Sequence, residues 1–180
     1  DVAVTGVQTC ALPISEWQVS EEVTPTWEPH ARPQVMFFGN LRGNSDIALL
    51  NDLSDVGGID LVGYGMLDST AAERVRARLK QAMRAPVPPG EVAAAARIAD
   101  ILVLPYAQDE FSKTISPAKY FECLASGAMV VSRARLDHLP GWTDYVVQLP
   151  SELTSEGPLR SLLDSHRARR TRSEEHTSEL

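Results

Sequence analysis

Short runs of mainly apolar residues alternate with stretches of helical spacing along most of this chain. The apolar runs are 35–38, 59–62, 101–104, 129–131 and 145–149, with 85–87 as a shorter candidate strand. Helical spacing covers 46–53, 71–83, 91–99, 117–126 and 158–171, and Ser45 is expected to cap the first of these helices. Runs that are apolar throughout indicate strands covered on both faces. Their alternation with helices predicts an α/β fold with a Rossmann-like parallel sheet sandwiched by helices.

Three of the predicted strands end at residues that let the chain turn sharply, namely Gly39, Gly63 and Pro105. In open α/β sheets, ligands bind outside the carboxyl ends of the strands. We therefore expect the loops after these strands to lie together at one edge of the sheet. Gly39, Gly63 and the loop residues Asn40 and Arg42 are candidates for ligand contact.

The segment 115–127 has the sequence of a helix start that binds an anion. Ser116 is a good N-cap and Pro117 suits the first helical position. Free backbone N–H groups at such an end favour a negative charge, and Lys119 adds a formal positive charge in the first turn. Glu122 lies three residues further on, so it shares a face with Lys119. This arrangement suits a sugar nucleotide, with phosphates at Lys119 and ribose hydroxyls at Glu122.

Two features of this helix also have simpler interpretations. Lys119 and Glu122 could form a surface ion pair at i,i+3 spacing, worth only about 0.2–0.5 kcal/mol. Cys123 is more often a small core residue than a nucleophile. We expect Tyr120, Phe121 and Leu124 to pack on the sheet.

Composition narrows the functional classes. Hydrophobic residues make up 43% of the chain and charged residues 23%, which is typical of a soluble globular protein. The formal net charge of −7 argues against non-specific binding to nucleic acid. No stretch is apolar for long enough to span a bilayer. The histidines His30, His138 and His166 lack metal-ligand spacing, so no metal site is predicted.

The two ends of the chain are related to each other at the level of DNA. Residues 7–15 read VQTCALPIS and residues 172–180 read RSEEHTSEL, and both can be written as opposite strands of one oligomer that resembles a short-read sequencing adapter. We therefore expect residues 1–15 and 172–180 to be adapter-derived and disordered. Residues 16–33, interrupted by three prolines, are interpreted as an interdomain linker, which leaves 34–171 as the folded domain.

Several motifs, in the same order, resemble one family. Residues 116–132 are similar to the SPxKxxExLAxGxPVVxS core of GT-B glycosyltransferases of the group 1, family-4-like kind. Residues 91–106 resemble the helix and strand that precede this core, and residues 35–41 and 61–65 resemble the first two strand–loop units of the family. The resemblance covers about residues 34–150.

The resemblance implies a nucleotide-sugar-binding domain, the C-terminal half of an enzyme whose N-terminal acceptor domain is missing. By position, Glu122 matches the carboxylate that holds the donor ribose, and Lys119 and the N–H groups from Ser116 onward match the diphosphate site. The Gly39 loop would approach the phosphates from the other side, with Arg42 as an extra charge. Thr114, Ile115 and Pro117 complete the predicted substrate-binding set. No side chain is assigned a catalytic role, and no metal or cofactor is expected.

One position departs from the family pattern. Many members carry a Glu-x7-Glu pair, and the earlier glutamate falls at Thr114, so Asp109 or Glu110 would have to replace it. The expected function is sugar transfer from a nucleoside-diphosphate sugar to an acceptor, as in polysaccharide biosynthesis. The resemblance further implies a cytoplasmic enzyme, with peripheral membrane contact through the full-length protein, and the fragment alone is expected to be inactive.

Two other functions remain open from the sequence. The same fold serves sugar-nucleotide epimerases, which would need acid and base residues of their own. A non-catalytic nucleotide-binding or receiver-like α/β module is the third possibility. Such a module would show no preference for a sugar diphosphate over phosphate alone.

Overall fold

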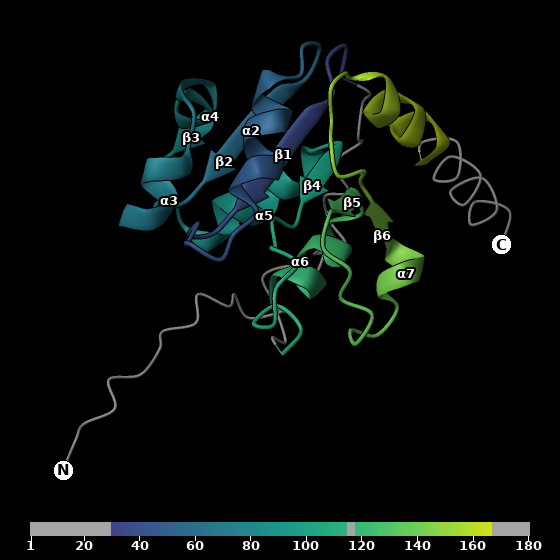
Figure 1. Cartoon of the computed structure of the whole chain (residues 1–180). Coiled ribbons are helices and arrows are strands. Elements are labelled where there is room, and N and C mark those ends of the chain that lie inside the picture. Colours follow the sequence, from purple (N-terminus) through teal and green to yellow (C-terminus); the bar gives the residue numbers. More distant parts are fainter. Residues whose placement is uncertain (1–29, 115–117, 167–180) are drawn as a thin grey trace, which may run out of the picture.

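A computed structural model of the chain describes residues 30–114 and 118–166. Within these residues, six strands form one sheet in the order β3-β2-β1-β4-β5-β6. The strands are β1 (Gln34–Phe38), β2 (Asp60–Tyr64), β3 (Met83–Arg84), β4 (Ile101–Val103), β5 (Met129–Ser132) and β6 (Val146–Gln148). Every neighbouring pair is parallel. The predicted α/β fold with a Rossmann-like parallel sheet is confirmed (Figure 1).

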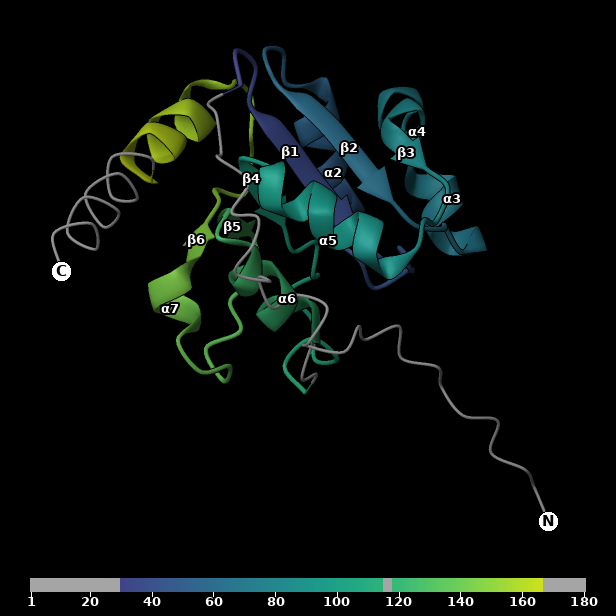
Figure 2. The same ribbon diagram turned by 180° about the vertical axis from the view of Figure 1, so that it is seen from behind.

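Helices cover both faces of this sheet. They are α2 (Ile47–Asp55), α3 (Ser69–Arg74), α4 (Ala77–Ala82), α5 (Pro89–Ile98), α6 (Ala118–Ser126) and α7 (Trp142–Tyr145), and residues 157–166 are also helical. Helix α2 lies in front of the sheet in Figure 1, whereas α5 lies over the opposite face in Figure 2. Among the described residues, no helix is long and apolar enough to cross a membrane.

Every strand except the short edge strand β3 contributes side chains to two separate cores. Val35 and Phe37 of β1 pack in the cluster formed with α2 and α4. Met36 and Phe38 pack in the cluster formed with α5 and α6. Successive side chains of a strand point to opposite faces, so a strand covered on both sides is apolar at every position. This two-sided burial explains the continuous apolar runs in the sequence.

The first helix begins at Ile47, and its cap lies one residue later than predicted. Asp46, rather than Ser45, is the N-cap of α2, and its Oδ1 accepts a hydrogen bond of 2.9 Å from the amide of Leu49. Ser45 instead uses its hydroxyl oxygen to accept from the amide of Arg42, 3.0 Å away. The carboxylate therefore stabilises the helix start, and the serine stabilises the loop before it.

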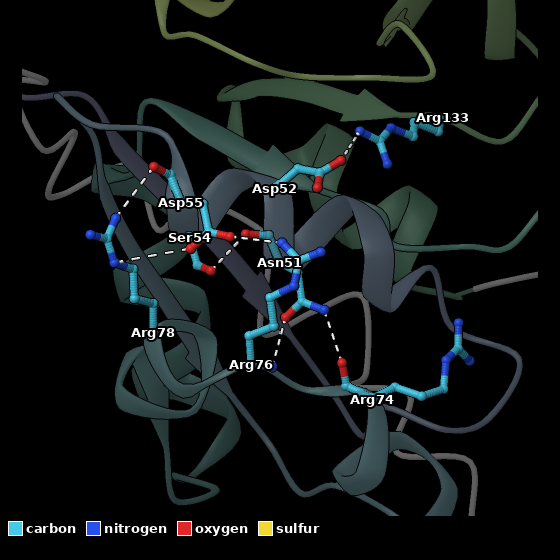
Figure 3. Close-up of polar contacts among 8 residues, drawn as sticks. All are labelled: Asn51, Asp52, Ser54, Asp55, Arg74, Arg76, Arg78 and Arg133. Atoms are coloured by element: carbon cyan, nitrogen blue, oxygen red, sulfur yellow. Dashed lines mark hydrogen bonds and ion pairs between the residues drawn. The ribbon is translucent and has the colours of Figure 1, made fainter.

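The helix predicted over residues 71–83 is broken into α3 and α4. The buried side chain of Asn51 on α2 stabilises this break, because it forms hydrogen bonds with the end of α3 and the start of α4 (Figure 3). Its Nδ2 donates to the carbonyl of Arg74 and its Oδ1 accepts from the amide of Arg76, each at 2.9 Å. Helix ends need partners for their free backbone groups, and here a distant side chain supplies them.

Two strand predictions at the sheet edges are shifted. The short strand expected at 85–87 is instead β3 (Met83–Arg84), which pairs with Gly63 and Tyr64. Since β2 ends at Tyr64, later residues have no strand beside them with which to pair. At the other edge, Tyr145 belongs to α7 rather than to the predicted strand 145–149, and α7 follows Gly141, whose φ is 70°.

Residues 30–33, assigned to the linker from the sequence, bond to the sheet. His30 Nδ1 lies 3.0 Å from the Oδ2 atom of Asp100, which also accepts from the amide of Gln34 at 2.8 Å. Arg32 donates to the carbonyl of Ile59 at 3.0 Å. The folded domain therefore begins before residue 34. The predicted adapter-derived segments and residues 16–29 lie outside the described residues.

Candidate functional site

The strand order places a switch point between β1 and β4. From β1 the chain moves outward to β2 and β3, and it then returns to form β4, β5 and β6 on the other side. Helix α2, after β1, packs on one face of the sheet, and α6, after β4, packs on the other. Ligands of such sheets bind outside the carboxyl ends of the strands at the point where the order reverses.

The loop after β1 is held between its two neighbouring loops by backbone hydrogen bonds. On the β4 side, the amide of Asp46 donates to the carbonyl of Pro105 at 2.9 Å. On the β2 side, the amide of Leu41 donates to Met66 at 2.9 Å, and Asp68 donates back to Leu41 at 3.0 Å. Backbone pairing of this kind fixes the carboxyl edge of the sheet without a regular strand.

Gly39 and Lys119, which are 80 positions apart, meet at this edge. Gly39 ends β1 with a φ of 99°, and a Cβ added to it would lie 2.1 Å from Cε and 2.8 Å from Nζ of Lys119. The lysine side chain therefore lies directly over the Gly39 backbone. The loop after β1 and the first turn of α6 therefore lie side by side at this edge.

Glu122 lies on the buried side of α6 and is only 3% exposed. Its neighbours Cys123 and Tyr120 are also buried, which agrees with the core role predicted for both. Burial raises the pKa of the Cys123 thiol, and the charge of Glu122 raises it further, whereas that of Lys119 lowers it. The carboxylate and the ammonium therefore both act on the same buried region beneath the switch point.

Tyr106, in the loop after β4, belongs to the same electrostatic environment. Burial raises the pKa of its phenol, and the Cys123 and Glu122 groups raise it further. Its ring packs against the core formed with α5 and α6. The phenol is therefore protonated at neutral pH and able to donate a hydrogen bond.

The prediction that Phe121 packs on the sheet is wrong, since its side chain is 43% exposed. The buried positions of α6 are Tyr120, Glu122, Cys123 and Ser126. At 3.6 residues per turn, position 121 falls outside the arc that these positions define. Glu122, by contrast, falls inside it.

Of the other predicted loop residues, Asn40 and Thr114 have side-chain hydrogen bonds within the protein. Asn40 is exposed, and its Oδ1 accepts from the amide of Met66 at 3.2 Å. Arg42 is exposed at the tip of the loop after β1. Thr114 is exposed too, and its hydroxyl donates to the carbonyl of Phe111 at 2.8 Å.

Gly63 has a packing role that accounts for it without a ligand. It lies inside β2 rather than after it, and a Cβ there would be 2.0 Å from the ring of Phe37. The turn falls instead at Gly65, whose φ is 153° and whose added Cβ would be 2.2 Å from the carbonyl oxygen of Gly39. Ile115, Ser116 and Pro117, which were predicted to contact the anion, lie outside the described residues.

The two acids proposed to replace the missing glutamate are engaged locally. Asp109 accepts from the amide of Ser112 at 2.7 Å, and this bond lowers the pKa of its carboxyl group. Glu110 forms an exposed ion pair with Lys113. Their placement therefore provides no direct support for a role in sugar binding.

The sequence placed Gly65 at this edge together with Gly63, but it did not single out Asp68. Asp68 caps α3 through a 2.7 Å bond from Ala71 and also accepts from the amide of Gly43, 3.1 Å away. An aspartate before a helical stretch is a recognisable cap signal, so the capping role of Asp68 could have been predicted from the sequence. Its contact with Gly43 depends on the packing of two loops and has no local signal.

One groove of about 340 Å³ lies elsewhere, between α2, β2 and α4. It is lined by Leu53, Ser54, Ile59, Leu61, Arg78, Gln81, Ala82 and Arg84. The groove is open, and it contains none of the predicted site residues, so we do not assign it the chemistry of the switch point. Within the described ranges, no group of three or more His, Cys, Asp or Glu residues is arranged to hold a metal ion.

Comparison with the sequence patterns of known protein families gives no match, and a search of curated proteins gives none either. The function is therefore inferred from the geometry of the carboxyl edge and from the motifs of the sequence.

Proposed function

We propose that this chain is the donor-binding domain of a glycosyltransferase that uses a nucleoside-diphosphate sugar. The observation that supports it most directly is the meeting of Gly39 and Lys119 at the switch point, with the buried acid Glu122 one turn further along α6. A glycine backbone without a side chain, a cation and a carboxylate in this order suit phosphates followed by a ribose.

In this proposal, the chain contributes to sugar transfer through positioning and charge. Lys119 would neutralise the diphosphate as it leaves the sugar, and Glu122 would orient the nucleotide by accepting hydrogen bonds from the ribose hydroxyls. Charged hydrogen bonds of this kind contribute about 1.5–3 kcal/mol each. The acceptor would bind to a domain outside this chain.

The strand order favours this proposal over a receiver-like module. Flavodoxin-like receivers have the order 2-1-3-4-5, whereas the present order, β3-β2-β1-β4-β5-β6, is the one found in dinucleotide-binding sheets. An epimerase has the same fold as a transferase, and it would also bind a sugar nucleotide at this edge. Product analysis with a bound sugar nucleotide separates these two enzymes, because an epimerase changes the sugar without any acceptor.

Ligand titration followed by NMR tests the proposal on the chain itself. UDP, GDP, dTDP and inorganic phosphate are added in turn to the protein, and at least one nucleoside diphosphate should bind more tightly than phosphate. Glu122→Gln, which keeps the size of the side chain, should weaken that binding by about fivefold, because a charged acceptor becomes a neutral one. The same variant should leave the affinity for inorganic pyrophosphate unchanged. Equal binding of phosphate and all three nucleotides would refute the proposal.

A further inference from the structure

The position of the Lys119 ammonium is set by the absence of a side chain at Gly39. A Cβ at residue 39 would overlap the lysine chain, at 2.1 Å from Cε and 2.8 Å from Nζ. Real Cβ atoms do not approach other heavy atoms this closely, so any larger residue would displace the lysine. The lysine therefore lies in a space that only glycine leaves open.

Tyr64 and Gly65, at the end of β2, hold the Gly39 backbone in place. The amide of Gly39 donates to the carbonyl of Tyr64 at 2.8 Å. The carbonyl oxygen of Gly39 packs against Gly65, where an added Cβ would lie 2.2 Å away. Both glycines have positive φ angles, 99° and 153°, which residues with side chains adopt at a cost. Gly39 is thus a fixed surface on which Lys119 rests.

Among the described residues, the ammonium placed in this way forms no ion pair. Lys119 is half-buried, and the ion pairs formed within residues 30–114 and 118–166 do not include it. In particular, it does not form the surface ion pair with Glu122 that its spacing allowed. A half-buried cation outside such an ion pair attracts an anion more strongly than a solvated cation does.

We propose that Gly39 is a positioning residue that acts on the phosphates through Lys119. The glycine holds the ammonium at the carboxyl end of β1, where the ammonium neutralises a bound pyrophosphate group. Gly39 therefore contributes to pyrophosphate affinity only when the lysine is present. This inference rests on the proposed function, because it assigns the ligand of the site to the diphosphate of a nucleotide.

A double-mutant cycle with inorganic pyrophosphate as the probe tests the inference. Affinity is measured by NMR titration for the 180-residue chain and for the Gly39→Ala, Lys119→Ala and doubly substituted variants. Each single variant should lose about tenfold in affinity, and the double variant should lose no more than Lys119→Ala alone. Gly63→Ala is the matched control, because its Cβ would meet the Phe37 ring at 2.0 Å without touching the lysine. It should lose stability and keep its pyrophosphate affinity.

The outcomes separate this inference from the proposed function. If Lys119→Ala loses affinity and Gly39→Ala, correctly folded, does not, the positioning role is overturned while nucleotide binding stands. If the wild-type chain binds neither pyrophosphate nor a nucleoside diphosphate, both fail. Should Gly39→Ala not fold, a nuclear Overhauser contact between the Gly39 Hα and Lys119 Hε protons of the wild-type chain decides the question. Its presence supports the seating of the lysine on the glycine, and its absence overturns it.

Discussion

Replacing Asn51 by alanine should destabilise the domain by separating α2 from the junction of α3 and α4. The side chain is 5% exposed and makes two hydrogen bonds of 2.9 Å, one to the Arg74 carbonyl and one from the Arg76 amide. A buried group left without its partner costs about 1–3 kcal/mol. Because Arg74 and Arg76 are themselves exposed, water reaches part of this junction, so we expect a loss near the low end for each group, or about 2 kcal/mol in total.

Urea unfolding followed by far-UV circular dichroism measures this change, provided that the slope with denaturant stays constant. Asn51→Asp keeps the acceptor for Arg76 but faces the Arg74 carbonyl with a second acceptor, so it should be about as unstable as the alanine variant. Ser54→Ala is the control, since it removes only the hydroxyl that donates to the Asn51 carbonyl at 2.7 Å. A loss below about 0.5 kcal/mol in Asn51→Ala, the range of ordinary surface changes, would refute the reasoning.

Two further predictions concern the other polar groups around the sheet. Arg133→Met should lower the free energy of unfolding in urea by about 1–3 kcal/mol, because the side chains of its 2.6 Å ion pair with Asp52 are only 12% and 28% exposed. Arg135→Met should lower it by less than about 0.5 kcal/mol, because the ion pair of Arg135 with Asp137 is exposed. Equal losses in the two variants would contradict this ranking. Cys123 should resist alkylation in the native protein and react after unfolding, as measured by peptide mapping, because burial raises the pKa of its thiol. The same shift should lower stability as the pH rises above the ordinary thiol value of 9.0, where the unfolded chain loses a proton that the folded chain keeps.

Much of the fold could be predicted because its signals are local. Mainly apolar runs identified the central strands β1, β2, β4 and β5, and the helix around Glu122 was located from its spacing and from the glycine that follows it. The places where prediction failed have a common physical cause. The break between α3 and α4 depends on Asn51, and the position of β3 depends on where β2 ends. Neither feature is therefore encoded in the local sequence of the segment concerned.

The candidate site divides in the same way. The sequence by itself determined which residue types could bind a sugar nucleotide, and that they follow strands at one edge, because strand ends and helix caps are written in short stretches of chain. Only the tertiary structure decided that β1 and β4 are the strands at the switch point, that Gly63 packs on Phe37, and that Lys119 lies on Gly39. These contacts join residues far apart in sequence, and their distances are set by the packing of helices on both faces of the sheet.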